Sequence, residues 1–297
     1  MSHEPPADVT RRITLPEIAA TVQRGGRLVV VTAYDAPSAR IADQAGVDMI
    51  LVGDSAGTTV LGLDATVPVT MEEMIVLTRA ASRGARRALV VADMPFGSYQ
   101  ISETDAVANA VRFLKDAGAD AVKLEGAGRT LTRIGAIHDA GIPVMGHIGL
   151  TPQSATLLGG YKAQGRTAAA ARRLVDEAVA LERAGCFSIV LEAMPAPVAA
   201  RVTEAVSIPT IGIGAGASCS GQVLVWHDLV GLTPDPARFV KTYADLAGVL
   251  RGALTAYVRD VRDGTFPDAS HTYGMPDAER LRFEDQLTSR RTTRSRS

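Results

Sequence analysis

Eight short apolar runs, separated by stretches of helical composition, constrain the fold of this chain more than any other feature. The runs cover residues 29–31, 49–52, 89–92, 121–122, 143–145, 189–191, 211–213 and 223–226. Runs rich in Val, Ile and Leu are typical of parallel strands that are buried on both faces. Most of them lead directly to a carboxylate, a lysine or a histidine, so the side chains able to do chemistry follow the predicted strands.

Segments rich in Ala, Arg and Glu lie between the runs and predict helices. They cover residues 36–45, 69–82, 103–117, 131–140, 168–184, 197–205 and 239–263, after an opening helix that begins near Thr14 and ends at Gly25. Strands that alternate with helices predict βαβ units and a parallel sheet. Eight units predict a (β/α)₈ barrel, whose active site lies at the carboxyl ends of the strands. Distant residues are therefore expected to meet in one pocket.

Composition excludes several classes of protein. The chain has 297 residues, 46% of them hydrophobic, a net charge of −1 and only 4% aromatic residues, so neither nucleic acid nor an anionic membrane is an expected partner. Cys186 and Cys219 are isolated thiols, which fits a reducing cytoplasm. No apolar run approaches the ~20 residues that a membrane span needs, and no secretory signal is visible. We expect a cytoplasmic protein.

The expected domain organisation is simple. Residues 1–13 predict a flexible N-terminus, residues 14–275 a single barrel domain, and residues 276–297 a disordered basic tail rich in Arg and Ser. Two long connections, residues 55–68 and 148–166, follow the second and fifth strands. Long connections in compact domains are usually lids or binding loops, and both of these belong to the expected active face.

Three acids, Asp54, Asp93 and Glu125, follow or end predicted strands. A single aspartate there could equally cap a helix or fix a turn. Three acids in one pocket repel one another unless a cation lies among them. A hard divalent ion such as Mg²⁺ is the simplest candidate, because the His and Cys spacing of a zinc site is absent.

Lys123 and Glu125 are two residues apart, so both side chains are expected to point into the barrel while Val122 and Leu124 face the helices. The pair could be a buried salt bridge, or Lys123 could neutralise a substrate carboxylate or enolate oxygen. Glu192 follows an apolar run, which favours a raised pKa and a role as general acid or base. It could equally be a capping or salt-bridged glutamate.

His147 and Ser55 are weaker candidates. The histidine could be a hydrogen-bonded core residue. Ser55 could bind a substrate oxygen or cap a turn, and it lacks the G-x-S-x-G pattern of a nucleophile. The glycines of residues 212–216 are spaced G-x-G-x-G, which does not match a nucleotide-binding loop. They favour a sharp turn or a close approach of the backbone to a ligand.

Six segments taken together resemble the ketopantoate hydroxymethyltransferase family. They are Val52-Gly-Asp-Ser55, Val90-Val-Ala-Asp-Met-Pro-Phe96, Val122-Lys-Leu-Glu-Gly126, Gly146-His-Ile-Gly-Leu-Thr-Pro-Gln-Ser154, Gly159-Gly-Tyr-Lys-Ala-Gln-Gly165 and Ile211-Gly-Ile-Gly-Ala-Gly216. The likeness extends from about Thr14 to about Tyr273. It differs at Leu63, where the family usually has an aromatic residue or histidine, and at Ala65, where it usually has a hydroxyl.

The resemblance implies a barrel of the phosphoenolpyruvate-mutase/isocitrate-lyase type. It implies transfer of a hydroxymethyl group from 5,10-methylenetetrahydrofolate, the co-substrate, to 3-methyl-2-oxobutanoate, which gives ketopantoate in pantothenate and coenzyme A biosynthesis. It also implies one Mg²⁺ per subunit and a homo-oligomer, a decamer by analogy. The implied site residues are Asp54, Asp93 and Glu125 for the metal; Asp54, Ser55, Asp93, Lys123 and His147 for substrate; and Glu192 for acid–base catalysis.

Two other functions remain open on the sequence. One is another Mg²⁺-dependent 2-oxo acid lyase or mutase on the same barrel, although such relatives usually carry a Lys-Lys-Cys-Gly-His loop that this chain lacks. The other is a non-catalytic protein that binds a 2-oxo acid.

Overall fold

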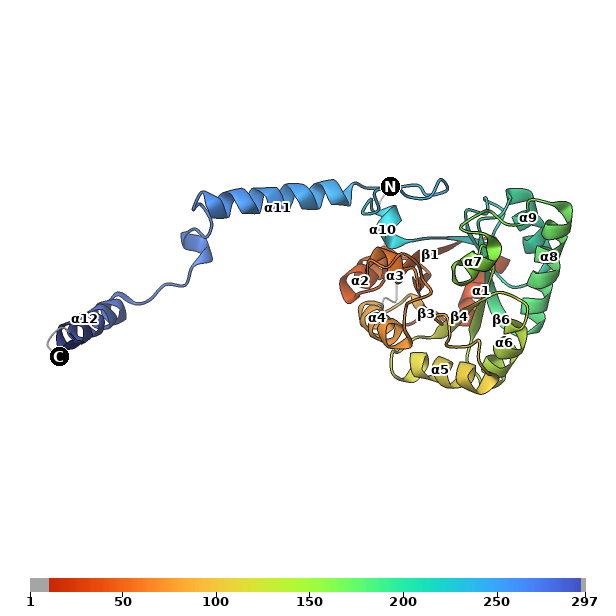
Figure 1. The fold of residues 1–297 in the computed structure, drawn as a ribbon, viewed down its shortest axis with the longest axis horizontal. Coiled ribbons are helices and arrows are strands. Elements are labelled where there is room, and N and C mark those ends of the chain that lie inside the picture. The colour runs from red at the N-terminus through yellow and green to blue at the C-terminus, as the bar shows by residue number, and fades with distance from the viewer. Residues whose placement is uncertain (1–10, 295–297) are drawn as a thin grey trace. The chain divides into compact units, whose positions relative to one another are not determined.

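The computed structural model describes residues 11–294, with side chains up to residue 288. Eight parallel strands pair in chain order and close into a barrel (Figure 1), as the sequence predicts. The strands are β1 (Leu28–Thr32), β2 (Met49–Val52), β3 (Leu89–Asp93), β4 (Ala121–Glu125), β5 (Val144–Gly149), β6 (Cys186–Glu192), β7 (Thr210–Ile213) and β8 (Gly221–Leu224).

Most strands are followed by a helix on the outside of the barrel (Figure 1). The larger helices of the barrel are α2 (Ala36–Gln44), α4 (Met71–Gly84), α5 (Glu103–Lys115), α6 (Thr130–Asp139), α8 (Ala168–Arg183) and α9 (Ala196–Ala205). Short elements lie in the connections: α3 (Ala56–Thr59), η1 (Pro152–Ser154), α7 (Ala155–Leu158) and α10 (Trp226–Leu229). The β7–β8 connection is the exception, because residues 214–220 form no helix.

The helices begin where local chemistry favours a start. Thr70 caps α4 and forms a capping box with Glu73, and Ser102 and Thr167 cap α5 and α8 with their hydroxyls. These caps satisfy backbone N–H groups that the helix leaves without partners. The predicted helix over residues 239–263 is the main difference, since α11 (Leu246–Arg262) begins only where the side chain of Asp245 accepts from Gly248 N.

Two apolar layers hold the barrel together. The outer layer lies between strands and helices and includes Val90, Leu124 and Phe113. The inner layer fills the barrel with alternate strand residues such as Val91 and Met145. Helix α1 (Leu15–Gln23) adds Ile18 to this inner layer. The interior is therefore packed with side chains rather than open as a pore.

Strand register decides which side chains of the active face become neighbours. Asp93 of β3 pairs in register with Lys123 of β4, and Glu125 of β4 pairs with His147 of β5. Adjacent strands lie about 4.8 Å apart, so each acid has a basic group beside it as a direct result of pairing. The carboxyl ends of β3, β4 and β5 thus carry two acid–base pairs.

The chain divides into two units between Ala244 and Asp245. The second unit contains α11, the short η2 (Ala269–His271) and α12 (Asp277–Arg294). Residues 245–275, which the sequence analysis places with the barrel domain, belong to this second unit, and α12 covers most of the tail for which the sequence favours disorder. None of the helices within residues 11–294 combines the length and apolar character needed to cross a bilayer.

Candidate active site

A small cavity of about 150 Å³ opens at the carboxyl ends of the strands. All seven predicted site residues line it: Asp54, Ser55, Asp93, Lys123, Glu125, His147 and Glu192. We call this cavity the active pocket. Five strands or the loops that follow them supply these side chains, from β2 to β6. The convergence that the apolar runs predict is therefore present in the structure.

Lys123 and Asp93 form a buried ion pair in the active pocket. The Lys123 Nζ lies 2.7 Å from Asp93 Oδ1, and both side chains are about 95% buried. Burial lowers the pKa of Lys123, but the charges of Asp93, Glu125 and Asp54 outweigh burial and raise it above its ordinary value. The lysine is therefore a permanent cation in this pocket.

His147 bridges two carboxylates across the active pocket. Its Nδ1 lies 3.4 Å from Glu125 Oε1 and its Nε2 lies 3.2 Å from Glu192 Oε2. Neither contact has good hydrogen-bond geometry, so the attraction is chiefly electrostatic. Burial and the charge of Lys123 lower the pKa of His147, but the two carboxylates outweigh them and raise it to about 9. The imidazole is therefore a cation at neutral pH.

The pKa of the Glu125 carboxyl responds to the same neighbours. Burial raises it, but His147, Lys123 and the backbone N–H of Gln153 together lower it below its ordinary value. Both of its oxygens are engaged, Oε1 by His147 and Oε2 by Gln153 N at 3.0 Å. Glu125 is thus held ionised and in one orientation.

Asp54 lies among like charges. Its backbone N–H donates to Asp93 Oδ2 at 3.1 Å, and its Oδ2 accepts from Gln153 Nε2 at 2.9 Å. Burial, followed by the charges of Asp93 and Glu125, raises the pKa of Asp54 to about 7. With all six predicted ionisable side chains charged, these residues carry two more negative than positive charges, and Asp228, which also lines the pocket, is a further carboxylate. A cation beside Asp54 would offset this excess.

The donor chemistry fits a hard divalent ion. The oxygens available are carboxylates, which Mg²⁺ prefers, and Mg²⁺ commonly uses one or two carboxylates together with waters and substrate. Within residues 11–294, no three His, Cys, Asp or Glu side chains are already placed to hold a metal together. Both oxygens of Glu125 and both oxygens of Asp93 have partners, whereas only Oδ2 of Asp54 has one among the described residues, so Asp54 is the most available direct ligand.

The active pocket is also lined by apolar side chains. They are Val190, Ile213, Val223, Val225 and Phe239, from β6, β7, β8 and the segment after β8. Glu192, at the end of β6, has 18% of its side chain exposed. The pocket therefore suits a ligand that has both an apolar group and charged oxygens.

The backbone at Glu192 is unusual. Ala193, the next residue, has φ of +46°, which is strained for a residue with a Cβ. Three backbone hydrogen bonds hold this point, from Leu150 N to Glu192 O, from Ala193 N to Ile213 O and from Gln164 N to Ala193 O. Gly149 is required beside it, because a Cβ there would lie 2.1 Å from Glu192 O. The carboxylate of Glu192 thus stands on a fixed backbone.

Sequence reasoning missed several residues of this site. Gln153 is buried and donates to the carboxylates of Asp54 and Glu125. Tyr99 is buried and bonds to the side chain of Gln153 and to Glu125 N. Thr66 lines the active pocket with a buried hydroxyl that has no hydrogen bond to the described residues. Tyr34 Oη lies 2.9 Å from Ser55 Oγ. The segment Thr151-Pro-Gln-Ser154 was part of the family resemblance, but nothing in its pattern assigned Gln153 a role.

His227, which follows the eighth apolar run, does not line the active pocket. It lies in α10, with its ring centroid 5.6 Å from that of Tyr34. The predicted run continues to residue 226, but β8 ends at Leu224. The histidine therefore belongs to a helix rather than to a strand end.

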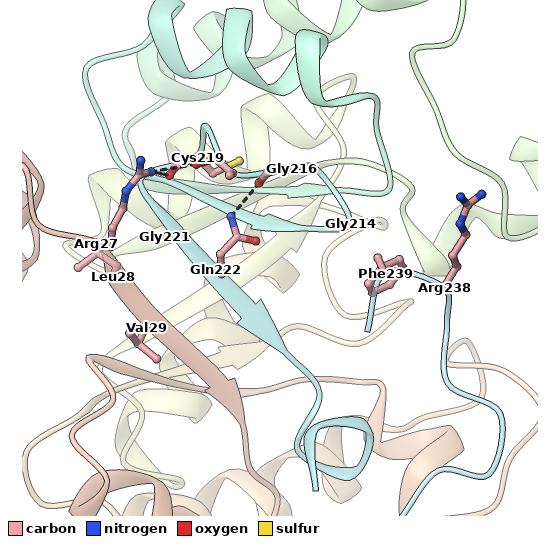
Figure 2. Close-up of a pocket in the computed structure, with 11 residues that line it drawn as sticks. Arg27, Leu28, Val29, Gly214, Gly216, Cys219, Gly221, Gln222, Arg238 and Phe239 are labelled. Atoms are coloured by element: carbon pink, nitrogen blue, oxygen red, sulfur yellow. Dashed lines mark hydrogen bonds between the residues drawn. The ribbon is translucent and has the colours of Figure 1, made fainter. Parts of the chain in front are cut away.

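A larger hollow lies on the outer wall of the barrel, beside β1 and β8 (Figure 2). Its volume is about 1050 Å³, and we call it the outer groove. Residues lining it are Arg27, Leu28, Val29, Gly214, Gly216, Ala217, Cys219, Gly221, Gln222, Arg238 and Phe239. The predicted glycine segment thus borders this groove, where Gln222 Nε2 donates to Gly216 O at 2.9 Å and Arg27 donates to the carbonyls of Ala217 and Cys219.

The chain is similar in sequence to known proteins. The model of the family described as ketopantoate hydroxymethyltransferase matches residues 12–269. A 3-methyl-2-oxobutanoate hydroxymethyltransferase from Thermobifida fusca is 55% identical over 263 residues, covering 89% of this chain and 94% of the relative. One from Moorella thermoacetica is 56% identical over 263 residues, covering 88% of this chain and 98% of the relative.

Solved structures with the same fold include phosphoenolpyruvate phosphomutase from Streptomyces platensis subsp. rosaceus, with a TM-score of 0.56, 17% identity and coverage of 93% and 98% of the two chains. Phosphonopyruvate hydrolase in complex with oxalate and Mg²⁺ has a TM-score of 0.56, 15% identity and coverage of 93% and 96%. The barrel is thus of the type that the resemblance implied. From its family match, its relatives and its pocket, this chain belongs to the ketopantoate hydroxymethyltransferase family.

Proposed function

We propose that this chain forms ketopantoate from 3-methyl-2-oxobutanoate by Mg²⁺-assisted enolate chemistry, with 5,10-methylenetetrahydrofolate as the one-carbon donor. Family membership and relatives at 55–56% identity support the hydroxymethyltransferase activity. The observation that carries the chemistry is the convergence of four carboxylates, a lysine and a histidine on one small pocket that is also lined by apolar side chains.

Asp54 and Asp93 are proposed as direct metal ligands, with Glu125 as the third acid of the site. When bound, Mg²⁺ would supply a Lewis acid that polarises the keto group and stabilises negative charge on its oxygen. The related fold of phosphonopyruvate hydrolase holds Mg²⁺ together with oxalate, which, like a 2-oxo acid, presents two adjacent oxygens. This parallel supports a metal beside the substrate carboxylate.

Glu192 is proposed to remove the proton from C3, the carbon next to the ketone. His147 Nε2 lies 3.2 Å from Oε2 of this carboxylate. Glu192 lines a pocket that also has apolar side chains, which suits a base that acts on a branched alkyl group. Lys123 balances the negative charge that then develops on the substrate oxygens. The nucleophilic C3 then forms a bond to the methylene carbon of the folate. The two bonds from that carbon to folate nitrogens break, water supplies the hydroxyl group of ketopantoate, and the nitrogens take up the C3 proton and a proton of the water, which releases tetrahydrofolate. Ser55 is proposed to bind substrate oxygen.

Other features of the proposal rest on the family resemblance alone. They are the identity of the folate co-substrate and a homo-oligomeric assembly, a decamer by analogy. The proposed cytoplasmic location rests instead on the isolated thiols of Cys186 and Cys219. The test of the donor is direct: purified protein should form ketopantoate from 3-methyl-2-oxobutanoate only when methylenetetrahydrofolate is supplied.

Exchange of the substrate C3 proton for deuterium tests the chemistry without the folate. Wild-type protein with Mg²⁺ should catalyse the exchange, and Glu192→Gln should slow it by about 10²-fold or more, the usual range for loss of a general base. Glu204→Gln, a change at an exposed glutamate of α9, is the matched control. Exchange at the wild-type rate in Glu192→Gln would remove Glu192 as the base.

The same assay examines the metal. Asp54→Asn should need a higher Mg²⁺ concentration for half-maximal exchange, because it removes a negatively charged oxygen from the site. An unchanged Mg²⁺ dependence would remove Asp54 as a ligand.

A lyase or mutase that uses a cysteine nucleophile is disfavoured by the positions of the thiols. Cys186 and Cys219 are both buried, and neither lines the active pocket. Burial raises the pKa of Cys186 to about 12, so its thiolate is not accessible at neutral pH. Binding of 3-methyl-2-oxobutanoate without C3 exchange would instead favour a non-catalytic binding protein.

A further inference from the structure

Gln153 lies in the long β5–α8 connection, next to Pro152, which lines the active pocket. It belongs to η1 and is 6% exposed. Every polar group of its side chain, and its backbone N–H, has a partner in the site. No role for this residue followed from the sequence or from the proposed reaction.

The contacts of Gln153 reach two of the proposed metal-site acids. Its Nε2 donates to Asp54 Oδ2 at 2.9 Å and to Met94 O at 2.9 Å. Its backbone N donates to Glu125 Oε2 at 3.0 Å. One residue of the connection therefore fixes an oxygen of Asp54, from the loop after β2, and an oxygen of Glu125, from β4.

Tyr99 fixes the amide in this orientation. Its hydroxyl donates to Gln153 Oε1 at 2.6 Å and accepts from Glu125 N at 3.3 Å. Since Met94 O and a carboxylate can only accept, the NH₂ end of the amide must face them and the carbonyl end must face Tyr99. The hydrogen bonds thus run in one direction, from Glu125 N through Tyr99 and Gln153 to Asp54.

We propose that Gln153 is a positioning residue for the metal, an inference that rests on the proposed function. As a neutral donor it orients Asp54 and Glu125 without cancelling their charge, so Oδ1 of Asp54 faces a ligand while Oδ2 is held. Partners of metal ligands in this position usually change metal affinity by about 10–100-fold when they are removed. Tyr99 supports this orientation through its bond to Gln153 Oε1, and it also accepts from the backbone N–H of Glu125.

The test is the affinity of the folded protein for Mn²⁺, measured by electron paramagnetic resonance titration, and for Mg²⁺, measured by calorimetry. Gln153→Met keeps the length of the side chain and the backbone N–H but loses both donors, and it should raise the Kd of each metal about tenfold or more. Gln164→Met is the matched control, since Gln164 lies in the same connection and its side chain bonds only to Lys162 O.

Tyr99→Phe is the second variant, and it should weaken metal binding less than Gln153→Met. In the double variant the loss of metal-binding free energy should be smaller than the sum of the two single losses, because Tyr99 and Gln153 share one hydrogen bond. Unchanged metal affinity in folded Gln153→Met, or in folded Tyr99→Phe should Gln153→Met not fold, would overturn the inference. If wild-type protein binds metal and forms ketopantoate but the variants match it, only this inference fails; if wild-type protein does neither, the proposed function fails.

Discussion

The outer groove is the larger of two hollows in this barrel, whereas the active pocket has the more highly charged lining. The groove is about 1050 Å³, and Arg27 and Arg238 are the charged residues that line it. The pocket is about 150 Å³ and is lined by Asp54, Asp93, Lys123, Glu125, His147, Glu192 and Asp228. Volume alone would select the groove. The density of buried charge selects the pocket, because burying charge is costly unless it is paired or used.

Replacing one cation in each hollow gives the largest expected difference in catalytic rate between the pocket and the groove. Lys123→Met should lower the rate of ketopantoate formation by about 10²–10³-fold, the usual effect of removing a group that stabilises developing negative charge. Arg238→Met, in the outer groove, should leave the rate within about twofold, since Arg238 is exposed and does not line the active pocket. Steady-state kinetics of both variants give the answer. Comparable losses in the two variants would assign chemistry to the groove as well.

The free energy of unfolding should also differ between variants in the pocket and variants in the groove. Asp93→Asn leaves the buried Lys123 without its partner at 2.7 Å, and breaking a buried pair costs about 3–5 kcal/mol. Gln222→Ala, which removes one contact on the groove wall, should cost about 1 kcal/mol. Urea unfolding at pH 7 without added metal measures both changes. A small loss for Asp93→Asn would mean that the pair is not desolvated.

The contribution of the pocket to the stability of the protein should also depend on pH. The pKa of His147 is raised to about 9 from an ordinary 6.5, so its contribution to stability is complete below pH 6.5 and is lost as the pH rises through about 9. We expect wild-type protein to lose about 2–3 kcal/mol of this contribution over that window. His147→Gln should lose correspondingly less. Unfolding free energies in chelator at pH 6.5, 8 and 9.5 compare the two proteins, and equal slopes would contradict the expected charge on His147.

Backbone strain gives the smallest expected difference. Ala193, beside the pocket, adopts φ of +46°, so Ala193→Gly should stabilise the protein by about 0.5–1 kcal/mol. Gly214, at the groove, has φ of +62°, and a Cβ there would lie 2.7 Å from Phe239. Gly214→Ala should therefore destabilise it by about 1 kcal/mol or more. Thermal unfolding of the two variants reads out the opposite signs, and the same sign for both would refute the strain argument.

Much of the site could be predicted because its residues lie at strand ends. The apolar runs located the eight strands, and a parallel barrel then places Asp93, Lys123, Glu125, His147 and Glu192 around one opening. Alternation along β4 placed both Lys123 and Glu125 on the inner face. These inferences needed only local pattern and a general property of the fold.

Residues on connections could not be found in the same way. Gln153 reaches Asp54 from 99 positions away, and its place depends on the path that residues 150–166 take. Tyr99 lies in another such connection. Composition does not reveal which residue caps a helix, so it predicts a helix from residue 239, whereas the helix begins at Leu246 after its cap, Asp245. Loop paths and caps depend on three-dimensional contacts that strand periodicity does not record.

Alternation within β4 also limits what this protein can tolerate. The amine of Lys123 and the carboxylate of Glu125 face inward only because an even number of positions separates them and because Val122 and Leu124 face the helices. Losing or gaining a single codon in this strand would turn both charges into the apolar shell and place leucine among the acids. Surface connections tolerate insertions and deletions, whereas the five residues of this strand must keep their number so that Lys123 and Glu125 stay on the inner face.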